Sequence, residues 1–281
     1  MTVLFITHYY AMYGANKSLL QLMLELRRDY GVQPIVLLRN KGELSEALEK
    51  EGIPYIVSHY YWWVNQDKGL FLKILNIRKQ ILNRLKIKKI LQQLEPYKID
   101  LVYSNSVCVN IGYYLKKRLQ TPHIWHIRES LESYRFKLSL GKVYSKYFFK
   151  KAADRYILIS DYLCEFYNDF LPMEKTIRIY NGIDFSDTET RTNKQGEYLN
   201  LCMVGIISEQ KNQLEGIEAI KIIRDIYHRE KNRLHLIGGH KSEYLALIKD
   251  FIRQNGLEEH VVFHGHQGNI HTLLREMNIK P

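Results

Sequence analysis

A glycine and a lysine flank the point where an apolar run gives way to a helical pattern in VGIISEQKNQLEGIEAI, residues 204–220. Gly205 ends the run, and Lys211 and Asn212 stand at the start of the helical pattern. A helix N-terminus presents N–H groups and partial positive charge, so it binds phosphate, and a lysine there adds a full charge. We therefore predict a phosphate-binding turn. A plain strand-to-helix turn, which also favours glycine and tolerates lysine, is the alternative.

Two more glycine turns follow apolar runs in the second half of the chain. Each is either a tight turn or a place where the backbone approaches a ligand. The turn residues are Gly238, Gly239, Gly265 and His266. The neighbouring His264 and His271 suggest a metal, but no carboxylate or cysteine completes a ligand set, so we predict no metal site.

Three segments of the first half, YGANKS, HIWHIRES and NGID, also place glycine or polar residues directly after an apolar run. A histidine, an arginine and a carboxylate within four residues favour a binding function, although a solvated loop or an internal Arg–Glu pair remains open. The two glycine segments are equally compatible with plain turns. The candidate residues are Gly14, Ala15, Asn16, His126, Arg128, Glu129 and Asn181.

These segments need a scaffold that brings strand ends together. Strand-like runs alternate with helical patterns, which predicts an α/β fold with parallel, doubly wound sheets that bind ligands beyond the carboxyl ends of their strands. Ser104, Asn105 and Ser106 are expected to cap a helix that begins at Val107. The predicted strands are residues 3–7, 33–38, 55–57, 100–104, 123–127, 155–159, 176–180, 199–204, 234–237 and 261–264.

The length of 281 residues favours two domains. The polar, aperiodic stretch FSDTETRTNKQG interrupts the alternation and predicts a linker over residues 185–198. We therefore expect a Rossmann-like domain over residues 1–184 and a second one over residues 199–281. Three strands are few for a free-standing domain of this kind, so we expect the second domain to be incomplete.

The formal net charge of +11 is unevenly distributed. Residues 1–150 hold 24 Lys and Arg against 11 Asp and Glu, whereas residues 151–281 hold 17 against 19. A basic front half indicates a polyanionic partner, either nucleic acid or an anionic membrane leaflet. Cys108, Cys164 and Cys202 lie far apart in apolar segments, which is typical of reduced thiols in a cytoplasmic protein. The chain starts on a strand-like run rather than a signal peptide.

One stretch concentrates this basic charge, because residues 68–89 contain eight Lys or Arg and no Asp or Glu. It has a helical pattern of apolar positions, and aromatic residues precede it at Tyr60–Trp63. We predict that residues 60–94, together with the basic and aromatic residues 142–151, face an anionic membrane surface, with each basic group contributing about 1 kcal/mol. The alternative is that the apolar stripe packs on the sheet and the lysines are only solvated. The stripe includes Leu70, Ile74, Ile77, Ile81 and Leu85.

Taken in order, these segments resemble the motifs of the GT-B glycosyltransferases of family 4 over nearly the whole chain. YGANKS resembles the glycine-rich acceptor-side loop, PHIWHIRE the segment with the acceptor-side histidine, and NGID the crossover motif N-G-[IV]-D. VGIISEQKNQ resembles the donor-phosphate motif G-R-x-x-x-x-K-[GN], and FHGH the F-x-G stretch near the donor base. Each match is weak alone, but their combination in this order is specific.

The resemblance implies that a sugar passes from a nucleotide-sugar donor to a lipid-linked or polysaccharide acceptor with retention, without a metal or other cofactor. It implies that His126 and Lys211 act at the reacting centre, with Lys211 on the leaving diphosphate. It also implies a cytoplasmic protein at the inner face of the cell membrane, with no nucleic-acid partner. The implied donor-binding residues are Gly205, Lys211, Asn212, Gly238, Gly239, Gly265 and His266. The implied acceptor-binding residues are Gly14, Ala15, Asn16, Arg128, Glu129 and Asn181.

Two departures from the family pattern set the alternative. Ile206 occupies the place of the donor-phosphate arginine and cannot bind phosphate, which leaves Lys211 alone. The family's acidic E-x7-E region would follow residue 281 in the chain. A truncated relative that binds membrane or nucleotide but transfers nothing is therefore the second hypothesis.

Overall fold

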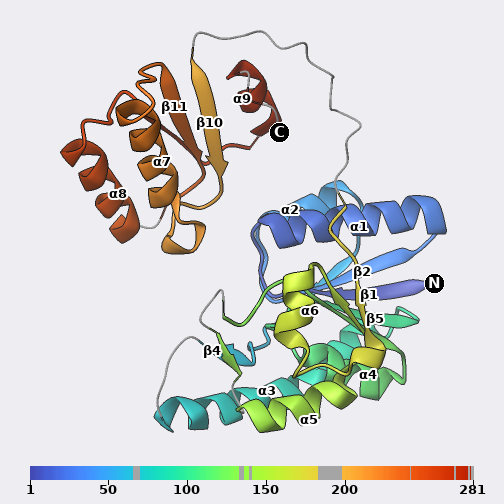
Figure 1. Cartoon of the computed structure of the whole chain (residues 1–281). Coiled ribbons are helices and arrows are strands. Elements are labelled where there is room, and N and C mark those ends of the chain that lie inside the picture. The colour runs from blue at the N-terminus through green and yellow to red at the C-terminus, as the bar shows by residue number, and fades with distance from the viewer. Residues whose placement is uncertain are drawn as a thin grey trace. The chain divides into compact units, whose positions relative to one another are not determined.

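The structure is a computed structural model of the chain (Figure 1). It describes residues 1–65, 70–132, 136–138, 141–182, 198–240, 242–268, 270–277 and 279. The chain forms two compact units, Met1–Asp184 and Phe185–Pro281, and each is an α/β structure on a parallel sheet, as predicted. Most of the predicted linker lies outside the described residues.

The first unit holds a seven-stranded parallel sheet with the strand order β3-β2-β1-β5-β6-β8-β9. The chain runs outward from β1 to β3 and then returns to the other side of β1, so the order reverses between β1 and β5. Loops at such a reversal leave a ligand-binding space at the carboxyl edge of the sheet. The strands are β1 (Thr2–Ile6), β2 (Gln33–Leu38), β3 (Tyr55–Val57), β5 (Leu101–Asn105), β6 (His123–Ile127), β8 (Arg155–Leu158) and β9 (Thr176–Arg178).

Helices cover both faces of this sheet, which confirms the doubly wound prediction (Figure 1). One face packs on α1 (Gly14–Tyr30) and α2 (Glu43–Lys50). The other face packs on α3 (Leu70–Leu94), α4 (Ile111–Leu119), α5 (Lys142–Ala152) and α6 (Asp161–Tyr167). Two short strands not expected from the sequence, β4 (Val64–Asn65) and β7 (Lys137–Leu138), form an antiparallel pair.

The helix expected from Val107 begins only at Ile111, so the prediction of Ser104–Ser106 as its N-caps is wrong. Val107 and Cys108 are buried and form a turn instead. Trp63 holds this turn, because its indole N–H donates to the Val107 carbonyl and its backbone N–H donates to the Cys108 carbonyl. Burial of two apolar residues outweighs four more residues of helix.

The aromatic segment Tyr60–Trp63 does not form an exposed membrane loop. The side chains of Tyr60 and Trp63 are fully buried, and only Tyr61 and Trp62 are partly accessible. The Tyr60 hydroxyl donates to the carbonyl of Thr7, and the Trp63 ring packs against Trp125 and Phe148 in the core. The membrane prediction is therefore wrong for these two rings, which pack in the core of the first unit.

Helix α3 turns a polar stripe inward over its first described half and leaves apolar residues outside. Asn76, Gln80 and Asn83 are buried, and Ile87, Ile90 and Leu94 continue the buried stripe. Asn83 bonds both the N–H and the carbonyl of Tyr61 at 2.8 Å, and Gln80 accepts from Asn110 at 2.7 Å. Ile77, Ile81 and Leu85 are 50%, 50% and 69% exposed, so this part of the apolar stripe does not pack on the sheet. No helix within the described residues is both long and apolar enough to cross a membrane.

The second unit holds a three-stranded parallel sheet with the order β10-β11-β12. Its strands are β10 (Leu199–Val204), β11 (Asn232–Ile237) and β12 (Val261–Gly265). Its helices are α7 (Gln213–Asp225), α8 (Ser242–Gln254) and α9 (Ile270–Glu276). The buried faces of α7 and α8 pack on β11 around Ile217, Ile248 and Leu236, which forms a core of its own.

Candidate active site

Arg128 organises the carboxyl edge of the first sheet. It follows β6, and its guanidinium donates to Asn105 Oδ1 at 2.6 Å, to Ser18 Oγ at 3.0 Å and to Asn181 Oδ1 at 2.6 Å. These partners come from the end of β5, the second turn of α1 and the NGID segment after β9. All three partners are neutral, so the half-buried Arg128 cation has no anionic partner in these bonds. Burial lowers the pKa of its guanidinium.

His126 lies on β6 beside Asn105 of β5 and is buried. Its Nδ1 shares a hydrogen bond of 2.5 Å with the hydroxyl of Tyr103, whose ring meets it edge-on at 5.8 Å. Its Nε2 is buried and has no hydrogen-bond partner among the described residues. Burial, and then the positive charge of Arg128, lowers the pKa of His126 to about 3, so the imidazole is neutral at pH 7.

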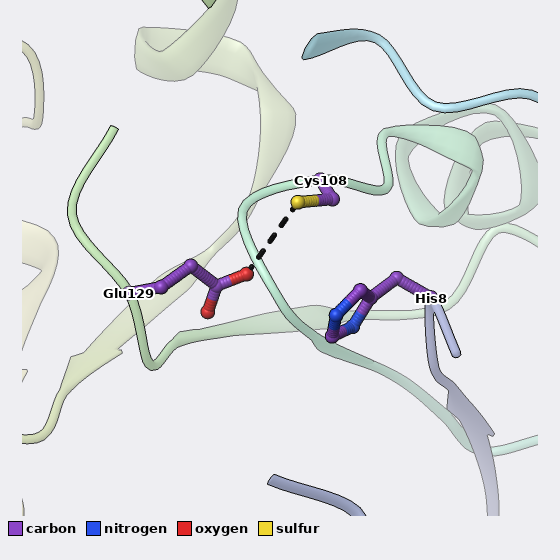
Figure 2. A group of neighbouring side chains, drawn as sticks. All are labelled: His8, Cys108 and Glu129. Atoms are coloured by element: carbon purple, nitrogen blue, oxygen red, sulfur yellow. Dashed lines mark hydrogen bonds between the residues drawn. The ribbon is translucent and has the colours of Figure 1, made fainter. Parts of the chain in front are cut away.

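The carboxylate of Glu129 points into the protein (Figure 2). It accepts hydrogen bonds from the Ser106 hydroxyl, from the Arg128 N–H at 3.1 Å and from the Cys108 thiol at 3.6 Å. Burial raises the pKa of Cys108 well above its usual value, so this thiol is protonated and donates. Glu129 therefore holds the loop after β6 against the turn after β5.

His8 completes this group, since its ring faces Glu129 and Cys108 in Figure 2. The three residues each offer one ligand atom, and these atoms lie within 4.8 Å of one another. His8, Cys108 and Glu129 are thus the residues that could hold a metal ion among those described. A metal would compete with the three hydrogen bonds that the carboxylate already receives, and the absence of a metal stays a prediction.

The loop after β1 is stiffened from within by Asn16. Its amide accepts from the Thr7 hydroxyl at 2.6 Å and donates to the carbonyls of Tyr9 and Ala11 at 3.0 and 2.8 Å. The Ala15 carbonyl accepts from Asn105 at 3.3 Å, which ties the start of α1 to β5. A Cβ added at Gly14 would meet no atom within 4 Å, so the backbone there faces open space.

Glycines form the carboxyl edge of the second sheet. Gly238 N donates to the Gly265 carbonyl at 2.7 Å, and Gly205 N donates to the Ile237 carbonyl at 2.8 Å. A Cβ added at Gly238 would lie 2.0 Å from the Gly205 carbonyl oxygen, so no side chain fits there. All three of these glycines have positive φ, and together they present backbone rather than side chains at this edge.

Lys211 stands above Gly205 at the start of α7. It ends a short 3-10 turn, and Asn212 follows in the left-handed conformation with φ of 49°. A Cβ at Gly205 would lie 3.7 Å from the Lys211 side chain, so the lysine stem runs over this glycine while the residue stays exposed. Gln213 fixes the intervening loop, because its buried amide bonds Ser208 N and the Ile206 carbonyl, each at 3.1 Å.

The structure therefore brings the predicted residues together in two groups, one in each unit. In the first, Arg128 joins Asn181 directly and reaches Ala15 through Asn105. In the second, Lys211 and Asn212 stand at Gly205, which lies beside Gly238, and Gly238 in turn bonds Gly265. Gly239 lies beside this edge, since its carbonyl accepts from Ile207 N at 2.8 Å, and His266 is exposed.

Several contributors were not found from the sequence. Ser18 lies within α1 and Tyr103 within β5, so their positions in the sequence give no sign of a site. Their hydrogen bonds to Arg128 and His126 identify them as site residues. Asn105 was interpreted as a helix cap, although its place at a strand end was a signal of its own. His264, considered as a metal ligand, bonds His235 at 2.9 Å. The side chain of His271 lies outside the described residues.

Two family models match the chain. Residues 12–187 match Glycosyltransferase Family 4, and residues 184–280 match Glycosyl transferases group 1. No curated protein matches the chain. Together the two models account for nearly all of the sequence, and the first alone covers more than half of it.

Solved structures of low identity share the fold. HepE of Anabaena in complex with UDP-glucose is 20% identical with a TM-score of 0.73, over 98% of this chain and 71% of that one. A glycosyltransferase of Rickettsia africae ESF-5 is 14% identical with a TM-score of 0.71, over 97% and 70%. The lipopolysaccharide outer core galactosyltransferase WaaB is 16% identical with a TM-score of 0.61, over 98% and 71%. The chain thus spans about 71% of the length of the first of these structures. By its matched models and its fold, the chain belongs to glycosyltransferase family 4 and is a glycosyltransferase of the GT-B type.

Proposed function

We propose that this glycosyltransferase takes its sugar from a nucleoside-diphosphate donor and transfers it, with retention, to the hydroxyl of a glycan or glycolipid. The observation that carries the proposal is the glycine edge of the second sheet with Lys211 above it. Bare glycine backbone that allows close approach, a helix start and one lysine form a site of the kind that binds a diphosphate. HepE, which shares the fold, was solved with UDP and with UDP-glucose.

Lys211 is assigned to the leaving diphosphate. Negative charge develops on the diphosphate as the sugar bond breaks, and a fixed cation placed there lowers the barrier. Ile206, at the family's arginine position, is partly exposed and apolar, so Lys211 is the cation of that motif. Gly205, Asn212, Gly238, Gly239, Gly265 and His266 are assigned to donor binding around it.

The edge of the first sheet is assigned to the acceptor. Arg128 presents a positive charge whose bonds go to neutral oxygens, and Gly14 leaves open space at the start of α1. We assign His126 to the reacting sugar, and Arg128, Gly14, Ala15 and Asn181 to the acceptor. Glu129 and Asn16 support this site through the bonds that hold its loops.

Calorimetric titration of the full chain with UDP tests the donor assignment. Lys211→Ala is expected to weaken UDP binding by about tenfold or more, since a charge-assisted bond to phosphate contributes about 1.5–3 kcal/mol. Lys221→Ala, which removes an α7 lysine paired with Asp225, is the matched control and is expected to leave UDP affinity unchanged. Equal affinity in Lys211→Ala and the original chain would contradict the role of Lys211.

We further propose that the exposed face of α3 and α5 binds an anionic lipid surface. The two helices lie side by side in Figure 1, and Arg84 of α3 acts electrostatically on Tyr144 of α5. Three aliphatic side chains of α3 are half-exposed or more, and Val143 and Tyr147 of α5 are 86% and 58% exposed. Because α3 buries amides and exposes aliphatic groups, its pattern favours an apolar environment outside the protein.

Basic groups surround this face. Arg78, Lys88 and Lys89 are exposed on α3, and Lys150 and Lys151 on α5. A hollow of about 360 Å³ lies between α3 and α4 and is lined by Arg84, Ile87, Tyr114, Lys117 and Arg118. Three cations around a hollow beside an apolar stripe complement the phosphate groups of an anionic lipid.

Flotation with vesicles of phosphatidylglycerol and phosphatidylcholine tests this surface. The triple variant Ile77→Gln, Ile81→Gln, Leu85→Gln is expected to lose most flotation, because glutamine keeps helix propensity but removes apolar area. The control Ile222→Gln, Ile226→Gln removes exposed isoleucines of the second unit and is expected to float normally. Equal flotation of the triple variant, equal binding to pure phosphatidylcholine, or preferential binding to DNA would each overturn the lipid assignment.

A further inference from the structure

The hydrogen bond between Tyr103 and His126 sets which nitrogen of the imidazole carries the proton. Among the described residues this is the only hydrogen bond of the Tyr103 hydroxyl, and His126 Nδ1 is its partner at 2.5 Å. Tyr103 and His126 are each 6% exposed, so bulk water does not replace a missing bond.

Two arrangements of the protons are possible for a neutral imidazole. In the first, the tyrosine O–H donates to Nδ1, and the histidine proton sits on Nε2. In the second, Nδ1–H donates to the tyrosine oxygen, which leaves the tyrosine O–H without an acceptor and Nε2 without a donor. The first leaves one buried polar group unsatisfied and the second leaves two. One further unsatisfied buried group lowers the population of an arrangement by roughly fivefold or more, so the first arrangement dominates.

The positive charge of Arg128, two residues along the chain, acts on the charge state of the same ring. Burial first, and then this charge, disfavours a second proton on the ring, which keeps His126 from becoming an imidazolium. His126 therefore remains a neutral ring with one N–H, and that N–H is at the nitrogen that has no partner within the described protein.

We propose that Tyr103 is a positioning residue that locks His126 as the Nε2–H tautomer, so that Nε2 serves as a hydrogen-bond donor to an oxygen of the bound sugar or acceptor. The inference rests on the assignment of His126 to the reacting centre. A donor at this place holds an oxygen and does not remove a proton, so His126 is not a general base. A ligand oxygen at Nε2 supplies the bond that the protein leaves unmade.

Nitrogen NMR of the full chain with ¹⁵N-histidine tests the tautomer directly. Correlations from the carbon-bound ring protons to both ring nitrogens are expected to show that Nε2 of His126 is protonated. They are expected to show that Nδ1 is unprotonated and accepts a hydrogen bond. The His126 signals are identified by their loss in His126→Gln. A proton on Nδ1 in the original chain would overturn the proposal.

Tyr103→Phe keeps the ring and removes only the hydroxyl. Its His126 Nδ1 signal is expected to shift to the position of a nitrogen that accepts no hydrogen bond. The matched control is Tyr156→Phe, which removes a buried hydroxyl that donates to the carbonyl of Phe149 and is expected to leave the His126 signals in place. Identical Nδ1 signals in Tyr103→Phe and the original chain would overturn the proposal. This measurement needs no sugar donor, so its failure is distinct from failure of the UDP titration.

Discussion

The carboxyl edges of the two sheets differ in what they expose, which is polar side chains in the first unit and glycine backbone in the second. The edge of the first sheet consists of polar side chains, among them His126, Arg128 and Glu129, whose hydrogen bonds join neighbouring strands and loops. The edge of the second sheet consists of Gly205, Gly238 and Gly265, where the backbone itself is presented. Side chains provide chemical variety, whereas bare backbone provides close approach to a group with many oxygens. Under the proposed function, the first edge serves the acceptor and the second serves the diphosphate.

The largest effect is expected where the glycine edge leaves no space. Gly238→Ala places a carbon 2.0 Å from the Gly205 carbonyl oxygen at positive φ, so we expect a loss of order 4 kcal/mol in the stability of the second unit. Gly239→Ala, where a Cβ meets nothing within 4 Å, is the control and is expected to be nearly neutral. Urea unfolding measures the free energy of unfolding of both variants. A stable Gly238→Ala protein would show that the backbone at Gly205 and Gly238 can move apart.

Acid is expected to weaken the first unit through its buried histidines. Burial lowers the pKa of His123 to about 4, although the Ala152 carbonyl and Asp154 oppose the shift and Lys116 adds to it. The unfolded chain binds this proton near pH 6.5, so the stabilisation is complete above pH 6.5 and is lost as pH falls toward 4. The loss reaches about 3 kcal/mol. Urea unfolding at pH 7.5 and pH 4.5 measures it, and His123→Gln is expected to reduce the difference. A flat profile would contradict the neutral state of His123.

Arg128→Gln separates the two edges by function. We expect sugar transfer to fall by about 10²-fold, because a positioned donor at the reacting edge is lost, while UDP affinity stays constant. Transfer is measured from a labelled UDP-sugar to membranes of the source cell, and UDP binding by calorimetry. Arg178→Gln removes an exposed arginine paired with Asp161 and is the control. A parallel loss of UDP affinity in Arg128→Gln would break the division between the edges.

The smallest effect is expected at Gly205. A Cβ there meets only the Lys211 stem at ordinary contact distance, so Gly205→Ala carries mainly the strain of φ at 151°, about 1 kcal/mol. We expect UDP affinity to fall several-fold and transfer to change in proportion. A larger effect on transfer than on UDP binding would mean that this glycine also serves the reacting sugar.

The sequence predicted the alternation of strands and helices well, because buried parallel strands and amphipathic helices leave clear periodic patterns. It also predicted residues at both edges, because they follow strands directly. It did not predict Tyr103 or Ser18, since their roles depend on which strand lies beside which. The late start of α4 was missed because the buried turn at Val107 depends on Trp63, more than 40 residues earlier.

Helix α3 shows a different limit of sequence reasoning. Its apolar stripe was compatible with a face packed on the sheet and with a face exposed to solvent. The inward-facing residues are polar amides, so hydrophobic periodicity did not identify them as buried. Asn83 and Gln80 find partners on Tyr61 and Asn110, which are distant in the chain. Only those partners explain why Ile77 and Leu85 are outside.

Hydrogen bonds of the Asn83 and Gln80 side chains, and not apolar packing alone, therefore determine which face of α3 points inward. Because those bonds do not involve the outward side chains, the outer row is free to vary without loosening the inner one. If this row contacts lipid as proposed, its substitution would retarget the protein among surfaces of different lipid composition without touching the carboxyl edges of the sheets.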